Sequence, residues 1–214
     1  MISAVLLILL GDFTYIFVKL FFKIDKLLFN HPYQIYVFDA FITHLILFII
    51  SIIFIKISKV KLLDILKIDK KLLYLIPITI SFGMAFSIMG SLMFKFFSQI
   101  ITDIGVIERN KEVYSELTSF LNKSIYFAVL GIITPISEEI FMRAYAYKVL
   151  RNRFNIVISI LLNTIIFILF HLIPSFIPVI IFANIVLCLS YEYTKNLYVP
   201  IILHLTINSY IFFV

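Results

Sequence analysis

Residues 137–143 read Ser-Glu-Glu-Ile-Phe-Met-Arg and place two carboxylates and a guanidinium within an apolar stretch of the chain. On a helix, Glu139 and Arg143 are four residues apart and share a face, so they can form an ion pair. Glu138 points about 100° away from Glu139. One carboxylate can therefore be held by the arginine while the other stays free for chemistry. The residues alone allow an alternative, in which the charges only join helices.

Two later apolar stretches also carry polar groups. His171 ends the segment Phe-Ile-Leu-Phe-His, and His204 and Asn208 lie four residues apart in His-Leu-Thr-Ile-Asn, so these two share a helix face. Each group alone is typical of helix packing or of an interhelical hydrogen bond. Together, a glutamate and two histidines could activate a water molecule and protonate a leaving amine. The same residue types could also bind Zn²⁺ and leave one position open for water.

Other polar groups in apolar stretches are weaker candidates for a direct role. Asp12, Asp39 and His44 lie in the first two stretches, and the spacing of Asp39 and His44 does not place both on one helix face. Asn163 and Asn184 are expected to form hydrogen bonds between helices.

The residues just before the glutamates predict a local break in the helix. Pro135 lacks an N–H donor and disfavours helical backbone at the residue before it. We therefore expect a kink or a new helix start at 135–137, with Ser137 capping the first turn.

The elements that carry these groups must be membrane spans. Of the 214 residues, 63% are hydrophobic and only 14% are charged, and the net charge is +6. Soluble domains carry about 25% charged residues, so the composition excludes a soluble enzyme and predicts an all-α integral membrane protein. The basic residues lie between apolar stretches, which is typical of loops at a membrane surface, and no nucleic-acid partner is expected.

The pattern predicts a bundle of about seven transmembrane helices, within a range of six to eight, since each span needs roughly 20 apolar residues. The predicted spans are 2–22, 33–55, 72–94, 124–147, 154–172, 175–194 and 197–214. Residues 1–123 would hold the N-terminal helices and their amphipathic connections, and residues 124–214 a four-helix catalytic core. The lysine-rich segment 56–71 predicts a cytoplasmic N-terminus and an outside C-terminus, against which Lys23 and Lys26 argue.

The three polar segments occur in a fixed order that resembles a known family. Glu-Glu-Ile-Phe-Met-Arg, Phe-Ile-Leu-Phe-His and His-Leu-Thr-Ile-Asn resemble the EExxxR, FxxxH and HxxxN motifs of the CAAX protease and bacteriocin-processing family of intramembrane proteases, also called the Abi or CPBP family. The resemblance covers residues 124–214. It departs at Met142-Arg143-Ala144, where family members often read Phe-Arg-Gly.

The resemblance implies an endopeptidase in the plasma membrane that cleaves a membrane-associated peptide or protein precursor. Glu138 would activate the attacking water with help from His171, and either glutamate could be the base. His204 and Asn208 would stabilise the oxyanion. The implied catalytic set is Glu138, Glu139, Arg143, His171, His204 and Asn208.

No cofactor is firmly implied, because the family has been described both as metalloproteases and as metal-independent glutamate proteases. If Zn²⁺ binds, it would do so through Glu138 or Glu139 together with His171 and His204. Two other functions stay open. One is a non-proteolytic membrane scaffold, bacteriocin-immunity or regulatory partner protein with the same fold, and the other is a small transporter that moves protons through the carboxylates.

Overall fold

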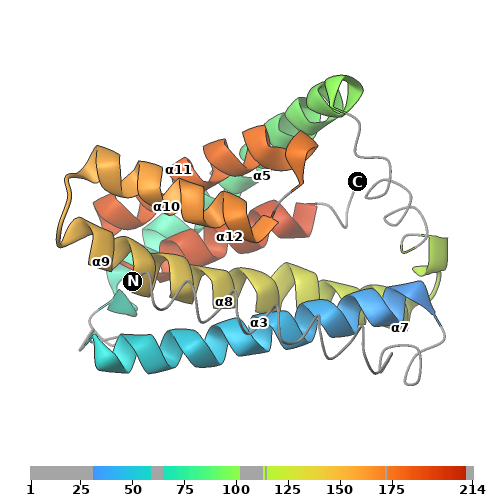
Figure 1. The fold of residues 1–214 in the computed structure, drawn as a ribbon, viewed down its shortest axis with the longest axis horizontal. Coiled ribbons are helices and arrows are strands. Elements are labelled where there is room, and N and C mark those ends of the chain that lie inside the picture. The colour runs from blue at the N-terminus through green and yellow to red at the C-terminus, as the bar shows by residue number, and fades with distance from the viewer. Residues whose placement is uncertain (1–30, 59–64, 102–112, 114, 172, 211–214) are drawn as a thin grey trace.

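The computed structural model describes residues 31–58, 65–101, 113, 115–171 and 173–210. Within these ranges every regular element is a helix, which confirms the predicted all-α class (Figure 1). In chain order the elements are α3 (Pro32–Ile57), α5 (Lys70–Ile100), α7 (Phe120–Tyr126), η1 (Phe127–Ile133), α8 (Thr134–Glu139), η2 (Ile140–Tyr147), α9 (Lys148–Arg151), α10 (Ile156–His171), η3 (Pro174–Phe176), α11 (Ile177–Thr194) and α12 (Tyr198–Tyr210).

Four described helical stretches are long and apolar enough to cross a membrane, judged by length and composition. They are Pro32–Ile57, Lys70–Ile100, Phe120–Arg151 and Pro174–Thr194. α10 is a shorter apolar helix. The predicted span at 2–22 lies outside the described residues, so the total of seven spans stays a prediction.

Large apolar side chains face outward on α3 and α5, among them Ile49, Ile53, Tyr74 and Leu92. Such surfaces suit lipid, which is as apolar as the side chains themselves. The polar side chains that cannot face lipid are instead buried between the helices, in particular Glu139, Arg143 and Asn184. The chain is therefore a helical membrane protein that buries several polar side chains between its helices.

Residues 120–151 form one continuous helical stretch that carries both glutamates, and α3 runs alongside it (Figure 1). Two parts of this stretch, η1 and η2, are π-helical, and they directly precede and follow the short α8 segment that holds the glutamates. Single π-helical turns within α-helices are frequent at functional sites.

The helix continues through Pro135, so no separate helix begins at 135–137, and the alternative of a kink there stays a prediction. In η1 the N–H of Thr134 donates to the carbonyl of Val129, five residues back, and this wider turn accommodates the proline. Ser137 does not cap a helix. Its hydroxyl donates to the carbonyl of Thr134 at 2.9 Å.

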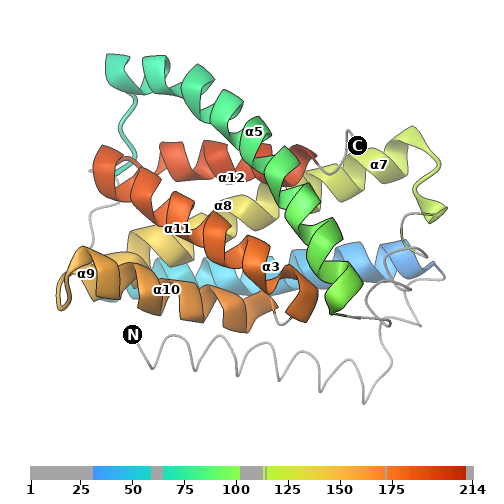
Figure 2. The ribbon, with the colours of Figure 1, turned by 90° about the horizontal axis from the view of Figure 1, so that it is seen from above.

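α12 packs between the N-terminal and C-terminal helices, against α5, α8 and α11. α5 crosses the bundle obliquely on that side (Figure 2). The two helices approach closely at Gly83, where an added Cβ would lie 2.9 Å from Cβ of Thr206. Glycine is therefore required for this spacing.

The turn between α11 and α12 is fixed by a connecting segment from the N-terminal half. α11 ends at Lys195, which adopts a left-handed conformation with φ of 52°. Asn196 then donates from Nδ2 to the carbonyl of Lys67 at 2.7 Å, and the N–H of Leu197 donates to the carbonyl of Ile65 at 2.7 Å. These bonds set where α12 begins, and thus the position of His204.

Candidate active site

Glu139 is bound by two cationic or proton-donating side chains. Its Oε1 atom lies 3.0 Å from Nη1 of Arg143 and 2.7 Å from Nδ1 of His204. Glu139 and Arg143 are both 0% exposed. The ion pair predicted from the four-residue spacing is therefore present, and it also reaches α12 through His204.

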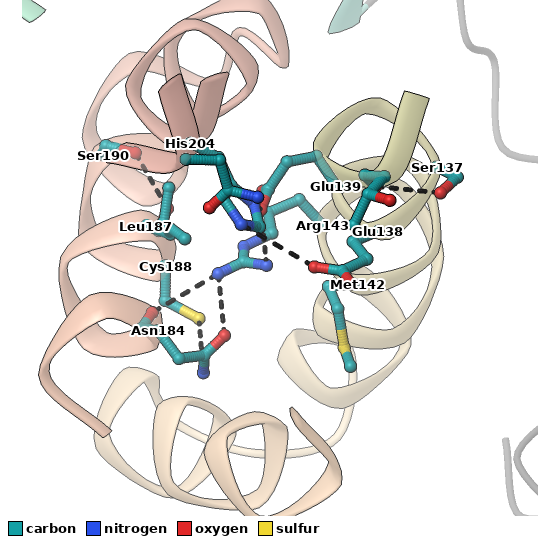
Figure 3. A network of polar contacts seen from close by, with 12 residues as sticks. Ser137, Glu138, Glu139, Met142, Arg143, Asn184, Leu187, Cys188, Ser190 and His204 are labelled. Atoms are coloured by element: carbon teal, nitrogen blue, oxygen red, sulfur yellow. Dashed lines mark hydrogen bonds and ion pairs between the residues drawn. The ribbon is translucent and has the colours of Figure 1, made fainter. Parts of the chain in front are cut away.

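Arg143 extends this pair into a chain of hydrogen bonds that reaches α11 and α10, and Figure 3 shows its first step, from Arg143 to Asn184. Its Nη2 donates to Oδ1 of Asn184 on α11 at 2.7 Å. Asn184 donates from Nδ2 to Oγ1 of Thr164 at 2.9 Å and to Oδ1 of Asn163 at 3.2 Å, both on α10. Asn163 in turn donates from Nδ2 to the carbonyl of Met142 at 3.2 Å, back on the helical stretch that carries Arg143. The interhelical bonds predicted for Asn163 and Asn184 are confirmed, and they hold the guanidinium in place.

Glu138 has a different environment from its neighbour. Its Oε2 lies 3.7 Å from Nε2 of His204, and its Oε1 lies 3.8 Å from Nε2 of His44. Both distances are too long for hydrogen bonds. Among the described residues, nothing forms a hydrogen bond with the buried Oε2. Glu138 is 8% exposed, so its carboxylate is buried without the partners that Glu139 has.

The contact with Glu139 fixes the orientation and tautomer of His204. A carboxylate only accepts hydrogen bonds, so Nδ1 of His204 must carry the proton that lies between the two groups. Nε2 of His204 then points toward Glu138. This nitrogen carries a lone pair when the ring is neutral and an N–H donor when the ring is charged. Glu139 thus plays the orienting part that carboxylates play in many catalytic histidine pairs.

His44 was not expected to take part in the site, and the structure corrects this. It lies on α3, and its Nδ1 is 3.1 Å from Oγ of Ser137 while its Nε2 faces Glu138. Its five-residue distance from Asp39 had argued against a shared site, but the partners come from another helix. The one signal in the sequence was an ionisable residue at membrane depth, which is costly and seldom without a function.

His171 does not contact the glutamates. Its Nδ1 lies 2.9 Å from the carbonyl of Phe167, and the two rings are 4.5 Å apart. Phe167 also packs near His204, with ring centroids 6.2 Å apart. No hydrogen bond or ion pair between described residues joins His171 to Glu138 or Glu139. The role implied for His171 by the resemblance stays a prediction.

Asn208 binds backbone in η1. In a π-helical register the carbonyl of Leu130 would accept from residue 135, but Pro135 has no N–H. Asn208 donates to that carbonyl from Nδ2 at 3.2 Å. In this arrangement Asn208 ties α12 to the backbone next to the proline, and its implied oxyanion role stays a prediction.

Within the described ranges, no group of three or more histidine, cysteine, aspartate or glutamate side chains is arranged to hold a metal ion. The set implied for Zn²⁺ needed His171 together with His204 and one glutamate. Nδ1 of His171 bonds to the carbonyl of Phe167, as an imidazole that binds a metal through its other nitrogen often does, and the Zn²⁺ set stays a prediction.

The comparison with known families agrees with the motifs. Residues 120–210 match the model of the family described as type II CAAX prenyl endopeptidase Rce1-like. No curated protein and no solved structure matches the chain. All six residues of the implied catalytic set fall inside the matched segment, whereas His44 lies outside it. Residues 120–210, which carry all three motifs, are therefore similar to the Rce1-like type II CAAX prenyl endopeptidases.

Proposed function

We propose that the protein is an intramembrane endopeptidase that hydrolyses a peptide bond in a membrane-associated peptide or protein precursor, with Glu138 as the general base. The observation that carries the proposal is the contrast between the two glutamates. Oε1 of Glu139 binds both Arg143 and His204, whereas the two oxygens of Glu138 only face imidazoles at 3.7 Å and 3.8 Å; Oε2 of each glutamate lacks a hydrogen bond from the described residues. A base needs a free oxygen that can take a proton.

The proposed reaction begins with a water molecule next to Glu138. The carboxylate takes one proton from the water, and the oxygen of the water forms a bond to the carbonyl carbon of the substrate. The carbonyl electron pair moves to its oxygen, and the imidazolium of His204 stabilises this oxyanion through an Nε2–H donor. Glu139 supports the imidazolium charge at Nδ1.

The tetrahedral intermediate then collapses. The carbonyl re-forms, the C–N bond breaks, and the leaving nitrogen takes the proton that Glu138 holds. The products are a carboxylic acid and an amine, and Glu138 returns to its charged form. Arg143 takes no proton in these steps. Its charge offsets that of Glu139, which would otherwise be a buried and uncompensated carboxylate.

The family match and one cavity of the fold support a proposal for the substrate class. The family name refers to prenylated C-a-a-X sequences, in which the cysteine carries an isoprenoid chain. An apolar cavity of about 320 Å³ lies between α5, α11 and α12, and Leu203, the neighbour of His204, is part of its lining. Such a cavity suits an apolar chain beside the peptide. We propose a substrate of this kind in the plasma membrane.

The test is cleavage by the purified protein in liposomes, with a farnesylated C-a-a-X reporter peptide. Replacing Glu138 by Gln keeps the shape of the side chain but removes the base, and we expect kcat to fall by at least about 10²-fold. Glu192→Gln is the matched control, because Glu192 is also buried but pairs with Arg151 and Lys195 instead. It should keep the wild-type kcat.

A Glu138→Gln variant that unfolds at the wild-type temperature and still cleaves at the wild-type rate would contradict the assignment of the base.

A parallel proteomic comparison of cells with the wild type and with Glu138→Ala should show one or more uncut precursors in the variant. A cleavage rate that falls on chelation and recovers with Zn²⁺ would show that a metal takes part.

A further inference from the structure

The site draws on a residue from outside the segment that matches the family. His44 lies on α3, more than seventy residues before residue 120, and α3 packs along the stretch that carries the glutamates (Figure 1). Nδ1 of His44 is 3.1 Å from Oγ of Ser137, and Nε2 is 3.8 Å from Oε1 of Glu138. The side chain of His44 is 15% exposed and that of Glu138 is 10% exposed, so the contact is largely shielded from solvent.

Ser137 determines how the His44 ring is oriented. The single hydroxyl proton of Ser137 is donated to the carbonyl of Thr134 at 2.9 Å. The oxygen of Ser137 can then accept a hydrogen bond from Nδ1–H of His44. With Nδ1 engaged in this way, Nε2 is directed to the carboxylate of Glu138.

This arrangement repeats the one on the other side of Glu138. His204 is held through Nδ1 by Glu139 and presents Nε2 to Oε2, while His44 is held through Nδ1 by Ser137 and presents Nε2 to Oε1. The two distances to the carboxylate are similar, 3.7 Å and 3.8 Å. One oxygen of Glu138 therefore faces each imidazole, and a rotation of the carboxylate would move both.

The cluster contains more negative than positive charge. Glu138, Glu139 and Arg143 are all buried, and with neutral histidines their charges leave one uncompensated negative charge. The polar groups that surround Glu138 therefore matter for where its carboxylate lies.

We propose that His44 is a positioning residue of the endopeptidase: its ring, placed by Ser137, lies next to Oε1 of Glu138 and limits the rotation of the carboxylate, so that Oε2 stays next to His204 and the scissile bond. The site then needs α3 as well as the family segment. This inference rests on the proposed function, in which Glu138 is the base. It assigns His44 a role that is exerted through Glu138 and not by contact with the substrate.

The first experiment compares His44→Leu and His44→Gln in the liposome cleavage assay. Leu cannot bind the carboxylate, and we expect kcat to fall on the order of 10²-fold with KM unchanged, because misplacement of a catalytic group costs about that much. The amide of Gln can still donate to Oε1, so His44→Gln should recover part of the lost kcat.

The matched control is Ser51→Ala. Ser51 is fully buried on the same helix, but its hydroxyl bonds only to the carbonyl of Leu47. We expect Ser51→Ala to affect only the unfolding temperature. If His44 had a packing role alone, His44→Leu would behave in the same way and leave kcat of the folded protein unchanged. That result would overturn the proposal.

The second experiment does not depend on activity and uses the full chain in detergent micelles. The chain has four histidines, so ¹⁵N-labelled imidazole signals are few enough to resolve by NMR. The His44 signal is assigned by its loss in His44→Gln. We expect it to shift in Glu138→Gln, and a signal that stays unchanged would overturn the contact.

The two experiments distinguish the failure of the proposed function from the failure of the positioning role of His44. If the wild type cleaves no C-a-a-X peptide and no precursor accumulates, but the His44 signal responds to Glu138→Gln, the proposed function fails while the contact stands. If the wild type cleaves and His44→Leu does so with unchanged kcat, the function stands and the positioning role fails.

Discussion

At the scale of single residues, the two adjacent glutamates differ because of what surrounds each one. Glu139 points toward Arg143 and His204 and is fully enclosed, so its charge is compensated. Glu138, one residue earlier, points toward two imidazoles at distances beyond hydrogen bonding. The helical turn of about 100° between neighbours is enough to separate the carboxylate that pairs with Arg143 from the one proposed to react.

The first prediction at this scale concerns Arg143. Replacing Arg143 by Met leaves Glu139 buried without its charge partner, and we expect the free energy of unfolding to fall by about 3–5 kcal/mol. Thermal unfolding in detergent measures the change. Adding Glu139→Gln to Arg143→Met removes the unpaired charge and should restore part of the stability. If Arg143→Met is as stable as the wild type, the ion pair of Glu139 and Arg143 does not stabilise the fold, and the prediction is wrong.

The second prediction concerns the geometry of the guanidinium. Arg143→Lys keeps the positive charge, but a single ammonium cannot form the separate bonds to Glu139 and to Asn184 that Arg143 forms through Nη1 and Nη2. We expect Arg143→Lys to lie between the wild type and Arg143→Met in unfolding temperature. Asn184→Ala should produce a larger loss than the lysine variant, since it also removes the bonds from Nδ2 to Thr164 and Asn163. A lysine variant with the full wild-type stability would show that charge alone is sufficient.

At the scale of elements, the site depends on a proline that does not break its helix. The wide turn of η1 lets the helix pass Pro135, and Asn208 on α12 binds the carbonyl that the proline leaves without a donor. The glutamates follow directly in α8, and η2 comes after them. The position of Glu138 and Glu139 relative to α12 is thus set by backbone geometry on both sides.

The prediction at this scale concerns the contact between α5 and α12. In Gly83→Ala, the new Cβ would meet Cβ and Cγ2 of Thr206 at 2.9 Å, and these atoms belong to a stiff, β-branched side chain. α12 must move away, and we expect a loss of stability of about 1–3 kcal/mol together with lower activity, since His204 moves with α12. Thr206→Ala in the same protein removes one of the two contacts and should reverse part of the loss.

Gly90→Ala is the control for this prediction, because it lies on the same helix but its nearest neighbour is a methyl group of Val179 at 3.3 Å. Its effect on stability and on kcat should be small. Equal effects of the two substitutions would show that the loss comes from the helix itself and not from the approach to α12.

At the scale of the whole molecule, the segment that matches the family is not sufficient to build the site. α3 contributes His44, α5 packs against α12, and the backbone of Ile65 and Lys67 fixes the turn before α12. The division of the chain between residues 123 and 124 stays a prediction, but residues from both sides of it contribute to the candidate site.

The prediction at this scale is that residues 115–214 expressed alone do not cleave the reporter peptide, whereas co-expression with residues 1–114 as a separate chain restores cleavage. The physical reason is that α12 loses its packing partner α5 and Glu138 loses His44 when the N-terminal part is absent. Cleavage and membrane insertion are measured in the same samples. Wild-type kcat from the C-terminal part alone would contradict the prediction.

The sequence by itself determined the class of the protein and the local parts of the site. Apolar stretches of span length predict helices in a membrane, because the bilayer leaves backbone groups no partner but one another. The pair of Glu139 and Arg143 was predictable, since residues four apart on a helix lie side by side. The order of the motifs was enough to indicate the family.

Only the tertiary structure decided which groups meet between helices. Helical periodicity gives the face on which His44, His171, His204 or Asn208 lies, but not which face of another helix packs against it. That depends on how helices cross, which is set here by Gly83, by the turn at Asn196 and by the wide turn before Pro135. For this reason His44 reaches Glu138 from a distant part of the chain, whereas Nδ1 of His171 bonds to the carbonyl of Phe167.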